Sequence, residues 1–336
     1  MNIAILGATG AVGQEFLSLF LRRKFPIGQL RLLASPRSAG SKLAFGEDLI
    51  PVEAVGPDSF EGVEIAFFSA GASRSREWLE PALRAGATVI DNSSAFRMDP
   101  SVPLVVPEIN WDQVRPDTRL IANPNCTAAI LCMALAPLRN LAPISRVIVS
   151  TYQSASGAGA AAMQELTDQT RAVLEGKDPE PKVLPHPYAF NLFSHNTPIN
   201  PQGQNEEEAK VMEETRKILG QPDLGMNVTC VRVPILRAHS ESVTIEFASN
   251  APDLEAVHDA LASFPGVRVV DDPLTNTFPM PISASGAEEV LVGRIRRDPS
   301  HPAAISLFIC GDQLLKGAAL NAVQIAERLL PVKSGR

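Results

Sequence analysis

The residue with the clearest chemical context is Cys126, which follows Asn125 and precedes the apolar stretch 128–138. Asparagine is a favoured helix N-cap, so we expect Cys126 to lie in the first turn of a helix. Unpaired N–H groups and the helix dipole lower the pKa of a thiol there and favour the thiolate. An inert buried thiol is the usual fate of cysteine, and Cys132, Cys230 and Cys310 fit it within apolar segments. Cys126 is therefore the candidate nucleophile.

A cysteine nucleophile needs a partner for proton transfer, and histidine is the commonest choice. Of the five histidines, His239 is embedded in a β-rich segment, whereas His186 and His195 lie in expected loops. Taken alone, His239 would more often be a structural histidine. Paired with Cys126, it becomes the candidate acid/base.

Several charged residues are candidates for binding anions. Arg232 can bind a carboxylate through two parallel hydrogen bonds, and Arg97 can hold an anion. Each could equally form a surface ion pair. The acids 206–208 begin an expected helix that also carries Lys210, and acids in a first turn are ordinary complements of the helix dipole.

Three glycines, Gly7, Gly10 and Gly13, lie between the first expected strand, 3–6, and a helix. Glycine lets the backbone turn tightly and approach a pyrophosphate, whose charge the N–H groups at the helix start then bind. Tight turns also use glycine for steric reasons alone, but the position between strand and helix favours dinucleotide binding.

The segment after the second expected strand indicates which dinucleotide binds. An NAD-selective site usually places Asp or Glu there, to bind the ribose 2′-hydroxyl. This strand instead runs into 35-SPRS-38, with no acid. Arg37 and its neighbouring serines suit a 2′-phosphate, so the sequence favours NADP over NAD; a solvated loop arginine is the alternative.

The elements that must position these residues fall into two groups. In the first third of the chain, short apolar runs alternate with helical patterns, which predicts a doubly wound α/β domain with a parallel sheet. Strands are expected at 3–6, 30–33, 65–68, 88–90, 104–106 and 120–122, and helices at 14–21 and 77–84.

The middle of the chain groups its strands and helices differently, which predicts an α+β domain around an antiparallel or mixed sheet. Strands are expected at 146–151, 227–233, 242–248, 267–270, 291–296 and 304–309, and helices at 158–174, 206–219, 254–264 and, last, 313–329.

Composition excludes several classes of protein. The 336 residues are 45% apolar and carry a formal charge of −7, which excludes a mainly disordered chain and argues against a nucleic-acid or anionic-membrane surface. No apolar run reaches the length of a membrane span, and the N-terminus is typical of a strand rather than a signal peptide. The cysteine spacing indicates neither disulfides nor a metal site, so a reduced, cytoplasmic protein is expected.

Taken together, the motifs resemble those of the aspartate-semialdehyde dehydrogenase family over nearly the whole chain. The matching stretches are GATGAVG at 7–13, LASPRSAG at 33–40, FFSAG at 67–71, DNSSAFR at 91–97, PLVVPEIN at 103–110, NPNCT at 123–127, STYQSASGAG at 150–159, RVPILRAHSES at 232–242 and GDQLLKGAALN at 311–321.

The resemblance implies roles for individual residues. Cys126 matches the acyl-enzyme nucleophile and His239 the acid/base. Gln153 contacts the substrate, Arg232 holds its α-carboxylate and Glu207 its amine. Phosphate is bound by Arg97 and Lys210. NADP is held by Gly7, Thr9, Gly10, Ala11, Val12, Gly13, Arg37, Ser38, Ser156, Gly157 and Gln313.

The resemblance also implies an architecture and a reaction. A doubly wound (Rossmann) NADP-binding domain, residues 1–126 plus 313–336, has an α+β catalytic and dimerisation domain, 127–312, inserted into it. The enzyme reduces L-aspartyl 4-phosphate with NADPH to L-aspartate 4-semialdehyde through a cysteine thioester, in lysine (diaminopimelate), methionine, threonine and isoleucine biosynthesis. Its partners are the small-molecule substrate, phosphate and a second copy in a homodimer, with a tetramer as the alternative.

Two other functions stay open at this point. N-acetyl-γ-glutamyl-phosphate reductase applies the same chemistry to a longer, acylated substrate, which has no free amine for Glu207 to bind. A non-catalytic paralogue of the same fold would have lost the nucleophile, and the intact set of Cys126, Gln153, Arg232 and His239 argues against it.

Overall fold

The computed structural model describes residues 1–330, and the chain divides into two compact units. Unit 1 comprises Met1–Asn125 and the segment that begins at Ala318, and unit 2 comprises Cys126–Gly317. The sequence-based limits assigned residues 126 and 313–317 to the first domain, whereas these residues pack with unit 2. Residues 331–336 of the expected terminal segment lie outside the described residues.

Unit 1 is built on a seven-stranded sheet with the strand order β3-β4-β2-β1-β5-β6-β7. All neighbouring strands are parallel except β3 and β4, which form an antiparallel hairpin at one edge. The strands are β1 (Asn2–Leu6), β2 (Gln29–Ala34), β3 (Lys42–Phe45), β4 (Asp48–Ala54), β5 (Ile65–Phe68), β6 (Thr88–Asp91) and β7 (Leu120–Ala122).

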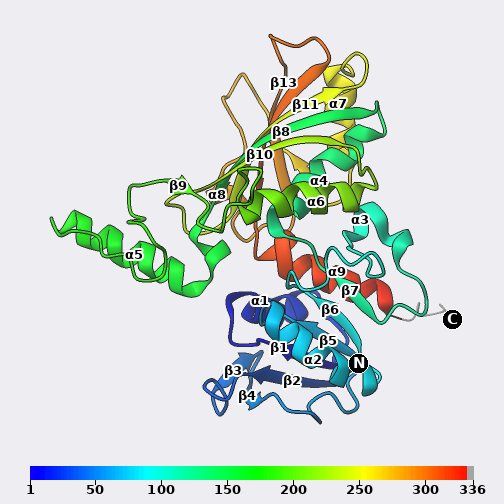
Figure 1. Ribbon diagram of the computed structural model, residues 1–336, viewed down its shortest axis with the longest axis vertical. Coiled ribbons are helices and arrows are strands. Elements are labelled where there is room, and N and C mark those ends of the chain that lie inside the picture. Colours follow the sequence, from blue (N-terminus) through cyan, green and yellow to red (C-terminus); the bar gives the residue numbers. More distant parts are fainter. Residues whose placement is uncertain (331–336) are drawn as a thin grey trace. The chain divides into compact units, whose positions relative to one another are not determined.

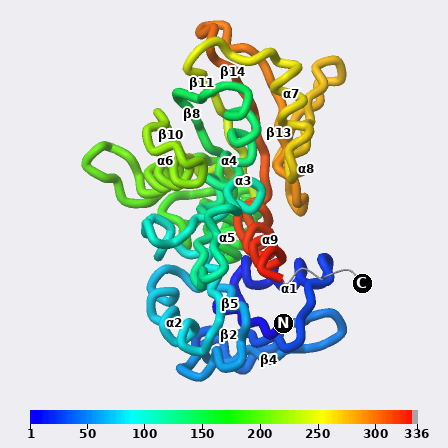
Figure 2. Tube along the Cα trace, turned by 90° about the vertical axis from the view of Figure 1, so that its right-hand side faces the viewer, coloured from blue at the N-terminus to red at the C-terminus, as the bar shows by residue number. Residues whose placement is uncertain are grey.

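Helices cover both faces of this sheet (Figure 1). Phe16 of α1 packs against Phe67 of β5, and Trp78 of α2 packs in the cluster that contains Phe68. Because side chains alternate along a strand, α1 and α2 lie on opposite faces. The last helix, α9, returns beside α1 (Figure 2). The helices are α1 (Ala11–Arg22), α2 (Ala72–Arg84), α3 (Pro107–Asn110), the 3-10 turn η1 (Trp111–Gln113) and α9 (Leu320–Leu329).

Two parts of unit 1 differ from the sequence-based expectation. The hairpin β3–β4 was not expected, because its edge strands are largely exposed and lack a continuous apolar run. The strand expected at 104–106 is wrong, since only Leu104 forms a single bridge, to Ala122. The Asn110 side chain bonds the Leu104 carbonyl and the Val106 N–H, and α3 begins at once with Pro107.

Unit 2 contains a mixed seven-stranded sheet with the order β12-β13-β14-β11-β8-β10-β9. The pairs β8–β10 and β12–β13 are parallel, and the remaining neighbours are antiparallel. The strands are β8 (Ile144–Gln153), β9 (Phe193–Ser194), β10 (Gly225–Arg232), β11 (His239–Phe247), β12 (Val267–Val269), β13 (Val290–Arg297) and β14 (Ala304–Gly311).

Helices α4, α6 and α7 pack together against this sheet, and α5 projects from it (Figure 1). Helix α4 is buried from Thr127 to Leu138, which is typical of a helix enclosed in a core. The helices are α4 (Cys126–Arg139), the 3-10 turn η2 (Ala155–Ala158), α5 (Ala160–Leu174), α6 (Glu206–Leu219), α7 (Leu254–Ala262), α8 (Pro281–Ala284) and the π-helical turn η3 (Leu315–Ala319). The expected fold class, a doubly wound domain with an inserted α+β domain, is confirmed.

The glycine turn of unit 1 yields a stability prediction. A Cβ on Gly13 would lie 2.5 Å from the backbone oxygens of Gly7 and Ala8, so Gly13→Ala should destabilise the protein by about 1–3 kcal/mol through overpacking. Both tryptophans, Trp78 and Trp111, lie in unit 1, so the urea midpoint of their fluorescence measures this unit.

Gly56→Ala is the matched control, because the nearest atom to its added Cβ is 4.0 Å away. Its free energy of unfolding, obtained from the same urea titration, should stay within about 0.5 kcal/mol of that of the parent protein. Equal midpoints for both variants would contradict the close approach at Gly13.

Candidate functional site

Three candidate residues lie together at one edge of the unit 2 sheet. Gln153 is the last residue of β8, Arg232 is the last of β10, and His239 is the first of β11. The parallel register pairs Gln153 with Arg232, and the antiparallel register between β8 and β11 brings His239 beside them. All three side chains are buried, so this edge forms a polar site enclosed by protein.

The first residue of α4 is Cys126, which is half-buried. A Cβ built on Gly317 would lie 2.7 Å from the Cβ of Cys126, so only a glycine at 317 leaves room for this cysteine. The next residue, Thr127, carries the hydroxyl that connects α4 to the sheet edge.

The amide of Gln153 joins three elements at this edge. Its Nε2 lies 3.1 Å from Oγ1 of Thr127 on α4, 3.3 Å from Oγ1 of Thr151 on β8, and 3.2 Å from Oε1 of Glu207 on α6. Gln153 is 1% exposed. The candidate substrate residues Gln153 and Glu207 therefore contact each other beside the start of the cysteine helix.

Helix α6 begins with a capping box that orients its acids. The Asn205 side chain accepts from the Glu208 N–H, and the Glu208 carboxylate accepts from the Asn205 N–H, so two free donors at the helix start are bonded. Glu208 also accepts from the Cys230 N–H of β10 at 3.0 Å. Glu207 is thereby directed into the core, whereas Lys210 lies one turn on and pairs with Glu206 at 2.6 Å.

The hydrogen bonds of His239 define its tautomer. Its Nδ1 lies 3.1 Å from the backbone nitrogen and 3.1 Å from Oγ of Ser154. A backbone N–H can only donate, so Nδ1 is an acceptor and the neutral ring carries its proton on Nε2. Burial, and then the charge of Arg232, lowers the pKa of His239 to about 3, so the ring is neutral at neutral pH. Among the described residues Nε2 has no hydrogen-bond partner, which leaves an N–H donor for a ligand.

The guanidinium of Arg232 is buried but incompletely bonded. Its Nη2 lies 2.8 Å from Nε2 of His195, while Nε and Nη1 have no hydrogen-bond partner within residues 1–330. A buried donor without a partner costs about 1–3 kcal/mol, which an anionic ligand would offset with charge-assisted hydrogen bonds. A Cβ on Gly157 would lie 3.3 Å from Nη1 and 2.9 Å from Cε1 of His239, so glycine keeps the space before both groups open.

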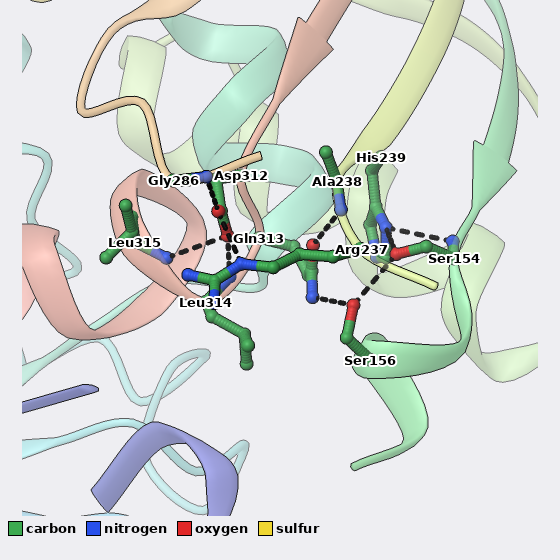
Figure 3. A network of polar contacts seen from close by, with 10 residues as sticks. All are labelled: Ser154, Ser156, Arg237, Ala238, His239, Gly286, Asp312, Gln313, Leu314 and Leu315. Atoms are coloured by element: carbon green, nitrogen blue, oxygen red, sulfur yellow. Dashed lines mark hydrogen bonds and ion pairs between the residues drawn. The ribbon is translucent and has the colours of Figure 1, made fainter. Parts of the chain in front are cut away.

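The backbone before His239 adopts an unusual conformation. Ala238 has a φ of +73°, in the left-handed region that costs a residue with a Cβ about 1–2 kcal/mol. Its N–H donates to Oε1 of Gln313 at 3.0 Å, and the Gln313 amide donates in turn to Oγ of Ser156 (Figure 3). Two candidate cofactor residues, Ser156 and Gln313, are thus bonded to each other.

A buried carboxylate fixes the segment that contains Gln313. Asp312 accepts from Nε of Arg237 at 2.6 Å and from the backbone N–H of Gly286 at 2.7 Å, and its other oxygen accepts from the Leu314 N–H at 3.0 Å (Figure 3). These bonds explain why residues 313–317 pack with unit 2 rather than with the doubly wound unit.

In unit 1, the glycine turn fits a pyrophosphate. Gly7 has a φ of +92°, and a Cβ there would lie 2.4 Å from the carbonyl oxygen of Ser69. The N–H groups of Gly7 and Ala8 donate to the Leu33 carbonyl. Gly10 then caps α1 without a side-chain hydrogen bond from the described residues, so the helix start presents backbone N–H groups to an anion. The remaining candidates of this turn, Thr9, Ala11 and Val12, are all half-buried.

The turn that follows β2 carries the candidate 2′-phosphate residues. Strand β2 ends at Ala34 and Arg37 is exposed, while Ser38 is half-buried and its N–H donates to the Ser35 carbonyl. An exposed guanidinium at this point suits a phosphate better than a ribose hydroxyl.

Arg97 lies against the segment that leads to the cysteine. Its Nε donates to the Asn123 carbonyl at 2.9 Å and its Nη2 to the Asn92 carbonyl at 2.7 Å. Asn321 of α9 bonds the Asn123 side chain at 2.7 Å. Arg97, Asn123 and Asn321, which come from three different motifs, therefore meet within unit 1.

Sequence reasoning missed four residues of this arrangement: Thr127, Ser154, His195 and Asp312. Thr127 and Asp312 lie inside motifs, but their contacts are long-range, and Ser154 acts partly through its backbone. His195 gave no signal beyond its residue type. Within residues 1–330, no helix could span a membrane, and no three His, Cys, Asp or Glu side chains are grouped to hold a metal.

Comparison with known proteins places the chain in a family. The sequence profile described as "Semialdehyde dehydrogenase, NAD binding domain" matches residues 2–116, and "Semialdehyde dehydrogenase, dimerisation domain" matches residues 135–316. These regions lie in the doubly wound unit and the mixed-sheet unit respectively. The chain is thus a two-domain, nicotinamide-dependent dehydrogenase of the semialdehyde dehydrogenase class.

Individual relatives show which family within this class the chain belongs to. The chain is 54% identical to aspartate-semialdehyde dehydrogenase of Synechocystis sp., over 98% of this chain and 97% of the relative. The structure of aspartate semialdehyde dehydrogenase II from Vibrio cholerae, complexed with ASA, has a TM-score of 0.93 at 41% identity, covering 98% and 97% of the two chains. The Candida albicans enzyme, solved with NADP, has a TM-score of 0.75 at 25% identity and 98% coverage of both. The chain belongs to the aspartate-semialdehyde dehydrogenase family, and the resemblance seen in its motifs is confirmed.

The four thiols should differ in reactivity. Burial raises the pKa of Cys132 and Cys230, and that of Cys310 to about 12, so these thiols stay protonated at neutral pH and the reactive thiolate is scarce. Iodoacetamide should therefore label Cys126 first in the folded protein, as read by peptide mass spectrometry. In urea all four should react. Native labelling of the buried thiols at the rate of Cys126 would show that this ranking is incorrect.

Proposed function

We propose that this chain reduces L-aspartyl 4-phosphate with NADPH to L-aspartate 4-semialdehyde and phosphate. The observation that carries the proposal is a pair of opposite charges at one buried edge. Arg232 has N–H groups to offer to a carboxylate, and Glu207 reaches the same edge through Gln153. A small amino acid presents both an α-carboxylate and an ammonium group, so this pair would fix both of its ends. The names of the relatives agree with this substrate.

The proposed nucleophile is Cys126. Its thiolate forms a C–S bond to the acyl carbon of the substrate, and the C–O bond to the phosphate then breaks, so phosphate leaves with the electron pair and a thioester remains. We assign Arg97 and Lys210 to the phosphate, where their positive charges would stabilise the departing phosphate. The N-terminal position in α4 supports this role, because the helix dipole favours the attacking thiolate.

NADPH bound at the glycine turn and at Arg37, Ser38, Ser156, Gly157 and Gln313 would supply the hydride that reduces the thioester. His239 would donate a hydrogen bond from Nε2 to the substrate oxygen, stabilising the negative charge of the thiohemiacetal on Cys126. When the C–S bond breaks, the carbonyl re-forms as the aldehyde and the thiolate is regenerated.

The related reaction on an N-acetylated substrate is less favoured. An N-acetylated substrate would place a neutral acetamide near the Glu207 carboxylate, which is 8% exposed, and a neutral group gains less from a carboxylate than a charged one does. An ammonium group pairs with it directly. The intact set of Cys126, Gln153, Arg232 and His239 argues against a non-catalytic paralogue.

We further propose a homodimer formed through unit 2, in the cytoplasm. The profile matched at 135–316 describes a dimerisation domain. Tyr152 of β8 and Phe308 of β14 lie on the two strands that flank β11, with ring centroids 6.3 Å apart, and remain partly exposed, so a second copy would bury apolar surface there. None of the four cysteines, all within the described residues, forms a disulfide, as suits a reducing compartment.

The direct test of the function is phosphate-dependent reduction of NADP with L-aspartate 4-semialdehyde. Cys126→Ala should lose at least about 1,000-fold in turnover, as expected for a covalent nucleophile, while still binding NADP. Cys132→Ala, a buried cysteine on the same helix, is the control and should keep its turnover. Near-normal turnover of Cys126→Ala would refute the thioester route.

Cofactor choice should depend on Arg37. Removal of one charge-assisted hydrogen bond of about 1.5–3 kcal/mol should raise the KM for NADP at least about tenfold in Arg37→Ala and leave the KM for NAD almost unchanged. Arg84→Ala, an exposed arginine on α2, controls for the lost surface charge. Parallel changes for both cofactors would mean that Arg37 does not read the 2′-phosphate.

A further inference from the structure

We infer that His195 is a positioning residue, a neutral acceptor that orients the Arg232 guanidinium toward the substrate carboxylate. The inference rests on the proposed function, since it deepens the role of Arg232 there. His195 comes from the loop between α5 and α6 and belongs to none of the motifs that carry the family resemblance.

The backbone holds His195 at the end of β10. The two-residue strand β9 pairs antiparallel with β10, with Phe193 opposite Arg232, and the His195 N–H donates to the Cys230 carbonyl at 2.9 Å. Both side chains are buried, Arg232 at 6% and His195 at 9% exposure. The imidazole is therefore fixed beside the guanidinium by the sheet itself.

The chemistry of the contact determines the state of the ring. Nη2 of Arg232 lies 2.8 Å from Nε2 of His195, and a guanidinium can only donate. Nε2 must accept, so the neutral ring carries its proton on Nδ1, which lies 3.3 Å from Oγ1 of Thr197 and donates to it. The same oxygen accepts from the Glu207 N–H at 3.3 Å. One chain of hydrogen bonds thus links Arg232, His195, Thr197 and Glu207, the two proposed substrate contacts at its ends.

The charges around His195 favour this neutral form. Burial and the charge of Arg232 on β10 lower its pKa to about 4, with Lys210 of α6 acting in the same direction and Glu206 and Glu207 of α6 opposing it. A further titratable group near His195 is His239 on β11, whose imidazole is neutral. The ring accepts a proton only in acid.

A neutral acceptor differs in kind from the usual partner of arginine. A carboxylate at this position would form an ion pair with Arg232 and compete with the substrate for the positive charge. The imidazole fixes the guanidinium by one hydrogen bond and leaves its charge uncompensated. Nε and Nη1, which lack partners among the described residues, are then presented to the substrate in a defined orientation.

Three substitutions of His195 distinguish a role in orienting Arg232 from a role in folding. His195→Gln keeps a neutral acceptor of similar reach, His195→Leu removes the acceptor, and His195→Glu introduces a competing charge. Steady-state kinetics with aspartate semialdehyde, phosphate and NADP should show the KM for the semialdehyde raised about tenfold or more in the Leu variant. It should rise further in the Glu variant and stay close to the parent value in the Gln variant. Turnover and the KM for NADP should change little in all three.

His186→Leu is the matched control, because the exposed His186 lies on the same loop and contacts Phe193 edge to face, with ring centroids 5.2 Å apart. Urea midpoints check that each variant is folded. If the Leu variant is not folded, the comparison of the semialdehyde KM between the Gln and Glu variants still tests the role of His195. An unchanged semialdehyde KM in the Leu and Glu variants, or an equal loss in every kinetic parameter, would overturn the role of His195. A parent protein with no activity on aspartate semialdehyde would instead refute the proposed function.

Discussion

The parallel pairing of β8 with β10 is the contact on which the rest of the site depends. It joins segments far apart in the chain and brings Gln153 and Arg232 to the same edge of one sheet. A shift of one residue in this register would turn Arg232 to the opposite face. Once the register is set, α4 and α6 need only bring Thr127 and Glu207 within reach of a single amide group.

The candidate site contains buried polar groups and a backbone conformation that are unfavourable for stability. Arg232 and His239 bury donors without partners among the described residues, and Ala238 lies in the left-handed region. Each departure costs stability, and such costs are concentrated where a structure is organised for a ligand. The surrounding bonds of Asp312 and Gln313 hold the strained segment in place. The side chains that we propose to bind the substrate are therefore fixed before it arrives, so little reorganisation would remain for binding.

The sequence analysis was most accurate for elements that are determined by residues close together in the chain. The glycine turn follows from the glycine spacing, the helix that begins at Cys126 from the cap candidate Asn125, and the helix 206–219 from its helical pattern. The structure has all three elements. The strand at 104–106 failed because a side chain, Asn110, bonded the backbone that a neighbouring strand would have paired. The hairpin β3–β4 left little apolar pattern, since it lies at an exposed edge. His195 could not be found, because its importance comes from the pairing of β9 with β10, which no local pattern announces.

The tautomer of His239 is determined by a main-chain donor, the N–H of Ser154, and this affects how the protein can vary. Every residue except proline supplies that N–H, so the protonation pattern of the ring does not depend on which side chain occupies position 154. It is inherited with the path of the loop that leaves β8. Sequence drift at this position is therefore compatible with an unchanged imidazole, whereas an insertion or deletion just after β8 would alter the ring chemistry without touching any catalytic side chain.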